Sequence, residues 1–305
     1  MTRQWFKWAF LEAGARTASK LMQKVIGLGS AMTLAHTYLA TVIIGLTQVI
    51  IGFVITKARQ KSIITKKSHI IGACLFGFFA TVATVTGFVA FLLGADVGIN
   101  TFIGTLAIVP GALISAWFFK TKIGFRKWLG ILIAVLGGYV ILGLPSLAEL
   151  RILPLWIWLS FAMMLAVSVN QGIARKIKDL DPFVKNFWGG LTTLILSLAG
   201  LAVMGSMNLV FDFSYPMPKL WFNSVLIGIF VVGIWSFSLI SFKRGAEIAI
   251  KRLVMNGAYL SAAMLFGILL FGESLTIFKI VGVLLYLIAF VFMDDTTWAH
   301  IRFKK

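Results

Sequence analysis

Charged residues are scarce in this sequence. They make up 12% of its 305 residues, whereas hydrophobic residues make up 60%. The mean hydropathy is +0.97. A water-soluble domain of this composition would expose large apolar patches and aggregate, so the composition excludes one. The bulk of the chain is therefore expected in lipid, and its continuous, non-alternating apolar segments exclude a β-barrel.

Cysteine and histidine are also scarce, with one cysteine, Cys74, and three histidines. A single cysteine excludes a disulfide within the chain. The histidines are scattered and no HExxH motif occurs, which disfavours a metal-dependent membrane enzyme. No GxxxxGK[ST] motif occurs, which disfavours direct coupling to ATP. We expect no enzymatic activity, no cofactor and no metal.

Positive charge, by contrast, is abundant, with a formal net charge of +18 at pH 7. Such a charge can bind nucleic acid. Here, however, Lys and Arg gather in short segments between apolar stretches, where they orient a membrane protein and meet anionic lipid headgroups. The lipid bilayer is the expected partner, and nucleic acid is not.

The apolar stretches are long enough to cross a bilayer, since a helical span needs about 20 residues. Clear spans are predicted at 34–55, 69–93, 97–119, 128–144, 155–174, 187–204, 220–242, 248–271 and 278–293. The stretch 5–24 is less clear. It begins as an apolar segment and then carries Glu12, Arg16 and Lys20, which share one helical face because they are four residues apart.

The loops between these spans alternate in charge. The segments rich in Lys and Arg are 57–67, 120–127, 175–185, 243–252 and 300–305. The segments between them are poor in positive charge: 94–96, 145–151, the region around Asp212, and 272–274. The positive-inside rule places the basic loops and the C-terminus in the cytoplasm, and the expected location is a bacterial inner (plasma) membrane.

The sequence also repeats itself about half a chain apart. GADVGIN at 94–100 recurs as GAEIAIK at 245–251, and 118–142 aligns with 270–293. The loop that contains GAD is predicted outside and the loop that contains GAE inside, so the two halves have opposite orientations. Each half must then hold an odd number of spans. Only 5–24 can supply the fifth span of the first half, which would put the N-terminus in the cytoplasm as well.

The expected fold is therefore an all-α integral membrane protein. It has ten transmembrane helices, the first one short, arranged as two inverted five-helix repeats at 1–148 and 149–305. Inverted repeats of this kind build secondary transporters, in which the substrate binds at the repeat interface near the bilayer midplane.

The chain resembles members of the drug/metabolite transporter superfamily that have ten spans and two EamA-type repeats. The resemblance rests on LFGESLT at 270–276, on the early glycine Gly282 of the last span, and on Pro110 in the fourth span. The chain departs from the pattern at Lys120, where the first repeat lacks the Gly-Glu. The resemblance implies a proton-coupled antiporter, a uniporter or an exchanger of small metabolites.

Two sets of charged residues are candidates for binding a substrate. Inside the membrane, Glu12 would be a proton- or cation-binding carboxylate tuned by Arg16, or Arg16 would bind an anionic substrate. The alternative is an ordinary i, i+4 ion pair on a surface helix. Lys251 and Arg252 begin the ninth span, and they either bind a phosphate or carboxylate at a cavity mouth or are positive-inside charges whose side chains snorkel. In the related organic phosphate translocators a Lys-Arg pair of the ninth span contacts phosphate.

Polar uncharged residues inside the spans complete the candidate site. Asn170 and Gln171 interrupt the sixth span, and their amides either bond across helices or line a cavity. Asn256 and Tyr259 share one face of the ninth span, and Asn100 is similar.

The predicted function is a secondary transporter that moves a small polar metabolite by alternating access, either proton-coupled or facilitated. Two alternatives remain at this stage. One is an exchanger of organic anions or phosphorylated sugars with the same fold, and the other is a membrane scaffold that transports nothing.

Overall fold

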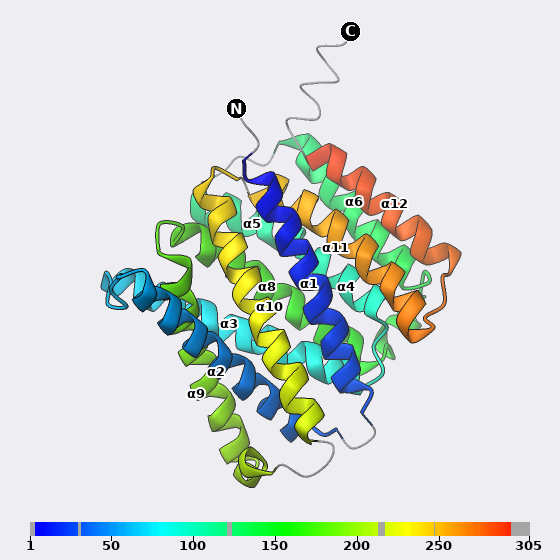
Figure 1. Ribbon diagram of the computed structural model, residues 1–305. Helices are drawn as coiled ribbons and strands as arrows, with labels where there is room; N and C mark the ends of the chain where they lie inside the picture. The colour runs from blue at the N-terminus through cyan, green and yellow to red at the C-terminus, as the bar shows by residue number, and fades with distance from the viewer. Residues whose placement is uncertain (1–3, 30–31, 121–123, 213–216, 247, 294–305) are drawn as a thin grey trace.

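The computed structural model describes residues 4–29, 32–120, 124–212, 217–246 and 248–293, and in them the chain forms helices without a strand (Figure 1). The helices are α1 Phe6–Gly27, α2 Leu34–Ala58, α3 Lys67–Leu92, α4 Val97–Thr105, α5 Ile108–Phe119, α6 Phe125–Ile141, α7 Leu147–Arg151, α8 Leu155–Lys176, α9 Pro182–Val203, the 3-10 helix η1 Met207–Phe211, α10 Met217–Lys243, α11 Ile248–Phe271 and α12 Ile277–Met293.

The predicted all-α membrane protein is confirmed at this level. Seven helices of the described residues are long and apolar enough to cross a membrane. They correspond to α2, α3, α4 together with α5, α8, α9, α10 and most of α11. α6 and α12 are apolar but have 17 residues each, and α1 has 22 residues but carries charge along its length.

The predicted span at 97–119 is not one continuous helix. It is divided into α4 and α5 by a turn at Leu106 and Ala107. Pro110 explains the division, because a proline ring clashes with the carbonyl of the fourth residue before it, here Leu106, and has no N–H to donate. The break leaves carbonyl groups at the end of α4, including that of Thr105, free to accept hydrogen bonds from side chains.

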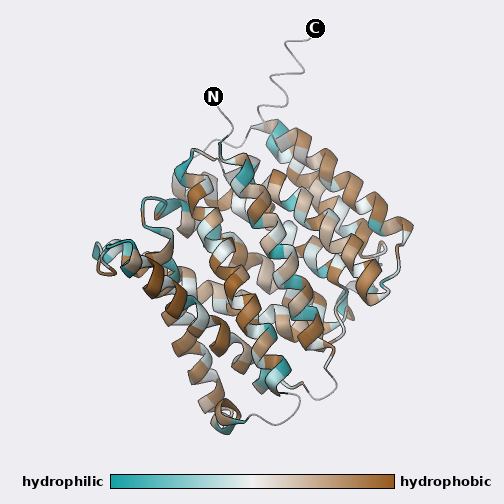
Figure 2. Cartoon of the chain, in the orientation of Figure 1, coloured by the Kyte–Doolittle hydropathy of each residue, from teal (hydrophilic) through white to brown (hydrophobic). Residues whose placement is uncertain are grey.

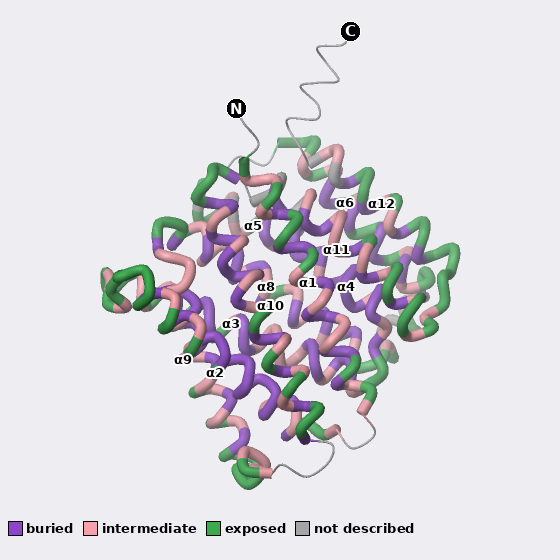
Figure 3. Tube along the Cα trace, viewed as in Figure 1, coloured by how far each residue is buried: buried purple, intermediate pink, exposed green. Residues whose placement is uncertain are grey.

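Helix α1 differs from a soluble surface helix, because most of its charged residues are buried and several of its large apolar residues are exposed. Figure 2 shows the hydropathy of the chain and Figure 3 its burial, in the same view. Glu12 is 0% exposed and Lys20 is 6% exposed, whereas Phe10 is 48% and Leu11 49% exposed. In water this arrangement would be unfavourable on both faces. It suits a helix with lipid on one side and protein on the other.

Close helix crossings hold the bundle together. α2 packs along α9, and α6 packs along α12. A Cβ atom on Gly45 of α2 would lie 2.7 Å from the backbone nitrogen of Leu194 and 3.0 Å from the carbonyl oxygen of Gly190, both on α9. A Cβ on Gly282 of α12 would lie 2.9 Å from the carbonyl oxygen of Gly137 on α6. Small residues let membrane helices approach this closely.

We predict that Gly45→Ala destabilises the protein. The new methyl group would meet backbone atoms of α9, which cannot rotate away as a side chain can, and overpacking of this kind costs about 1–3 kcal/mol. Thermal unfolding of the purified protein in detergent measures the effect. Gly14→Ala in α1 is the matched control, because a Cβ there meets nothing within 4 Å. Equal melting temperatures for the two variants would contradict the close crossing.

Candidate functional site

The candidate site begins with Glu12, whose carboxylate lies between two cations. Its Oε1 accepts from Arg16 Nη2 at 2.7 Å and from Arg16 Nε at 3.0 Å, one turn along α1. Its Oε2 lies 2.7 Å from Nζ of Lys251 on α11. Lys251 Nζ also donates to Ser238 Oγ on α10 at 2.6 Å. These four residues therefore join α1, α10 and α11 through a polar network in which Glu12 and Lys251 are fully buried and Arg16 is partly buried.

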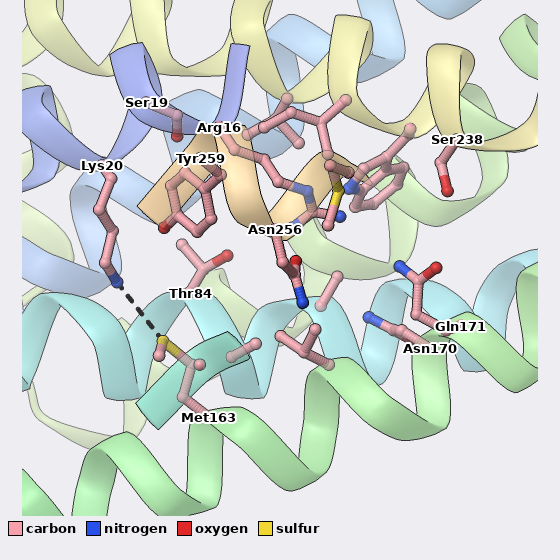
Figure 4. A pocket seen from close by; sticks show the side chains of 18 of the residues that line it. Arg16, Ser19, Lys20, Thr84, Met163, Asn170, Gln171, Ser238, Asn256 and Tyr259 are labelled. Atoms are coloured by element: carbon pink, nitrogen blue, oxygen red, sulfur yellow. Dashed lines mark hydrogen bonds between the residues drawn. The ribbon is translucent and has the colours of Figure 1, made fainter. Parts of the chain in front are cut away.

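A cavity of about 140 Å³ opens beside Arg16, between α1, α3, α4, α8, α10 and α11. Figure 4 shows polar side chains from α1, α3, α8, α10 and α11 around it. Five of the predicted site residues line this cavity: Arg16, Asn170, Gln171, Asn256 and Tyr259. The fold therefore brings together residues that are as far apart in the sequence as Arg16 and Tyr259.

The two amides on α8 have different roles. In the amide orientation that satisfies both groups, Asn170 donates to the carbonyl of Phe76 at 3.0 Å and accepts from the N–H of Ala80 at 3.1 Å, which ties α8 to α3. Gln171 is also buried, but its Oε1 has no hydrogen-bond donor among the described residues. Of the two alternatives, bonding across helices applies to Asn170, while Gln171 presents an unsatisfied acceptor at the cavity.

Asn256 is hydrogen-bonded to α12 and to the end of α4. Its Nδ2 donates to Tyr286 Oη on α12 at 3.1 Å and to the carbonyl of Thr105 at the end of α4 at 3.4 Å. The break that Pro110 imposes supplies this carbonyl acceptor. Figure 4 shows Asn256 and Tyr259 extending into the same cavity from α11.

The remaining predicted residues do not line the cavity. Asn100 is fully buried, and its Nδ2 donates to Ser160 Oγ on α8 at 2.6 Å, so it joins α4 to α8. Glu12 and Lys251 lie behind the cavity wall and act on it through Arg16 and Ser238. Lys251 is 0% exposed, so its interpretation as a snorkelling loop charge is wrong. The side chain of Arg252 lies outside the described residues.

Among the buried lysines that were not predicted as site residues, Lys20 and Lys185 contact the cavity or the side chains that line it. Lys20 lines the cavity from α1. Lys185 was assigned to the basic loop 175–185, but it lies within α9 and is fully buried. Its Nζ lies 3.8 Å from the centre of the Phe76 ring and donates to the carbonyl of Trp235 at 3.3 Å. The signal was present, because Asp181 caps α9 and Pro182 follows it, which is typical of a helix start.

A second charged cluster lies where α4 begins and the segment between α11 and α12 packs against it. Nζ of Lys279 lies 2.5 Å from Oδ2 of Asp96, the residue that caps α4. Glu273, from LFGESLT, accepts from the backbone N–H of Val97 at 2.6 Å and of Gly98 at 3.2 Å. Burial and the neighbouring Asp96 carboxylate raise the pKa of Glu273 above its ordinary value. Glu273 accepts from two of the first N–H groups of α4, which have no acceptor within their own helix.

No family model and no curated protein matches the chain. In fold, the chain is similar to 28 chains of solved structures. One of them, from a crystal structure, matches with a TM-score of 0.63 and 19% sequence identity. The match covers 97% of this chain and 99% of that one. At this identity the similarity concerns the fold alone, and it extends over nearly the full length of both chains.

We predict that Glu12→Gln destabilises the protein, because it leaves the buried Lys251 without its carboxylate. Removing one partner of a buried ion pair costs about 3–5 kcal/mol. The double variant Glu12→Gln/Lys251→Gln is the matched control, and it should recover much of the lost stability because both charges are gone. Thermal unfolding in detergent measures both. A single variant as stable as the parent protein would contradict the buried pair.

Proposed function

We propose that the chain is a secondary transporter of the drug/metabolite transporter type, which moves a small polar metabolite across a membrane by alternating access. The observation that carries this proposal is the polar cavity. Its lining comes from both halves of the chain: α1, α3 and α4 precede residue 148, and α8, α10 and α11 follow it. Cavities at the interface of two repeats bind the substrate in transporters of this kind.

The packing of the helices supports the inverted repeat on which this mechanism depends. If 1–148 and 149–305 are related by a two-fold axis in the membrane plane, α1, α2, α3 and α6 are equivalent to α8, α9, α10 and α12. A contact between two helices must then have an equivalent. The contact between α3 and α8 has its equivalent in the contact between α10 and α1. In the same way, the contact between α3 and α9 has its equivalent in the contact between α10 and α2. α2 and α9 pack on each other, as do α6 and α12.

We propose ten spans, with α1 as the first. Its buried charged face and exposed apolar face fit a span better than a surface helix, because a surface helix would turn Glu12 and Lys20 toward water. The start of α1 and the end of α12 lie at the same end of the bundle (Figure 1), as an even number of crossings requires. Together with the basic loops, this arrangement supports the proposal of a bacterial inner-membrane protein with both termini in the cytoplasm.

Within this proposal Glu12 is a fixed counterion rather than the site of a transported proton. Two cations at hydrogen-bond distance favour its ionised form. Its role is to hold Arg16 at the cavity wall and to bind α1 to α11. A membrane scaffold that transports nothing has no need of a polar cavity, because each buried polar group that lacks a partner costs free energy.

Alternating access predicts that one cavity position reacts from both sides of the membrane. Thr84 lines the cavity from α3, whereas Phe78 on the same helix is 44% exposed toward lipid. In a Cys74→Ser background, which has no other cysteine, Thr84→Cys should react with a membrane-impermeant maleimide in both right-side-out and inside-out vesicles. Phe78→Cys is the matched control and should react in neither. Labelling of Thr84→Cys from one side only, or from neither, would contradict the proposed function.

A further inference from the structure

We propose that the carried metabolite is a small hydroxylated organic anion, whose charged group binds between Lys20 and Arg16 and whose hydroxyl group donates to Gln171. The site is the cavity of the proposed function, and as a transport site it rests on that function. The substrate class itself rests on three separate features of the cavity: its excess of positive charge, an acceptor without a donor, and its size.

The first feature is charge. Arg16 and Lys20 line the cavity, and no Asp or Glu is among its described lining residues. Behind the wall, Glu12 lies between Arg16 and Lys251, so there is one carboxylate for three basic side chains. Neither Lys20 nor Lys185 has a carboxylate within 4.0 Å among the residues that the structure describes. Charges withdrawn from water in a membrane are costly unless they are paired, so an anion entering this cavity would be strongly favoured.

Lys20 is the cation best placed to meet that anion. Its Nζ points across the cavity toward α8, where it lies 3.5 Å from the Met163 sulfur (Figure 4). On the other side it lies 4.8 Å from the centre of the Phe91 ring. A thioether is a weak hydrogen-bond acceptor, and an aromatic ring stabilises the charge of an ammonium group less than water does. A carboxylate or phosphate oxygen at this point would replace the thioether with a charge-assisted hydrogen bond.

Arg16 can bind the same anion. Two of its N–H groups, on Nε and Nη2, donate to a single oxygen of Glu12. A guanidinium group has five N–H donors, so others remain for a ligand in the cavity that Arg16 lines. Glu12 fixes the direction of the guanidinium and so prepares it to bind an oxyanion without further ordering.

The second feature is Gln171 Oε1, a buried acceptor with no donor among the described residues. Figure 4 shows Gln171 near one end of the cavity and Lys20 near the other. A ligand that reaches both must carry an anion at one end and an O–H or N–H at the other. An ammonium group would add a further cation to a cavity that already has an excess, so a hydroxyl group is the donor that fits.

The third feature is size. A cavity of about 150 Å³ holds a molecule as large as benzene. The cavity here, at about 140 Å³, therefore suits a metabolite with about six to ten non-hydrogen atoms. This excludes nucleotides and whole lipids. Short hydroxycarboxylates are of the right size, and so are the smallest phosphate monoesters, which present the same oxyanion and hydroxyl chemistry.

The test uses lactate, its neutral counterpart lactamide, and propionate, which lacks the hydroxyl group. Glycerol phosphate and glycerol form a second pair with phosphate as the anionic group. Binding to the purified full-length protein in detergent is measured by thermal shift and titration calorimetry. We expect lactate or glycerol phosphate to bind at least tenfold more tightly than its neutral counterpart, since a hydrogen bond to a charged group contributes about 1.5–3 kcal/mol.

Three variants assign the residues. Lys20→Gln should weaken binding of the anion by about tenfold or more. Lys24→Gln is the matched control: it removes the same charge one turn further along α1, where the ammonium donates to the carbonyl of Ala95 and does not line the cavity. It should change binding less than threefold. Gln171→Leu should weaken binding of lactate but not of propionate.

Several outcomes would overturn the anion site. The first is that each anion binds no more tightly than its neutral counterpart, for lactate and lactamide as well as for glycerol phosphate and glycerol. The second is that neither anion binds at 10 mM. The third is that Lys20→Gln binds the anion as tightly as the parent protein does. If Lys20→Gln does not fold, the charged and neutral ligands still decide the question on the parent protein. The cysteine labelling described above tests transport independently, so loss of the anion site and loss of the carrier function give different results.

Discussion

The cost of charge in a low-dielectric interior is the constraint on which the rest of this structure depends. A carboxylate cannot remain in the middle of a bundle surrounded by lipid unless cations neutralise it. Glu12 meets this condition through Arg16 on its own helix and Lys251 on α11, and Ser238 adds α10. One buried carboxylate therefore fixes the position of α1, which has too few apolar residues to be held by lipid on every side.

The cavity follows from the same arrangement. Because Arg16 is directed by Glu12, its guanidinium forms part of the wall, and Lys20 lies one turn further along the same face of α1. The opposite walls are supplied by amides that are mostly satisfied by other helices, such as Asn170 and Asn256. Among the residues that the structure describes, cations exceed carboxylates at this cavity, and the Gln171 oxygen has no hydrogen-bond donor. A ligand with an anionic group and a hydroxyl group would pair with them.

Hydropathy and loop charge predicted the helices well, because lipid leaves the backbone no other way to satisfy its hydrogen bonds. The same signals could not predict the division of the span at 97–119, where the local effect of Pro110 outweighs the apolar run. They also misassigned Lys185 to a loop, because a buried lysine over Phe76 and Trp235 has the same sequence signature as a basic loop residue. Five of the predicted site residues line the cavity, but the distinct roles of Asn100, Asn170 and Gln171 depend on helix crossings, which a sequence does not specify.

The central claim is that α1 crosses the membrane with its charged face turned into the protein. Lys7 and Leu28 lie at opposite ends of this helix and are both exposed. The most direct measurement labels Lys7→Cys and Leu28→Cys, each in the Cys74→Ser background, with an impermeant maleimide in intact cells and in inside-out vesicles. A crossing helix predicts that Leu28→Cys reacts in intact cells and Lys7→Cys only in inside-out vesicles. Labelling of both positions from the cytoplasmic side would contradict the account.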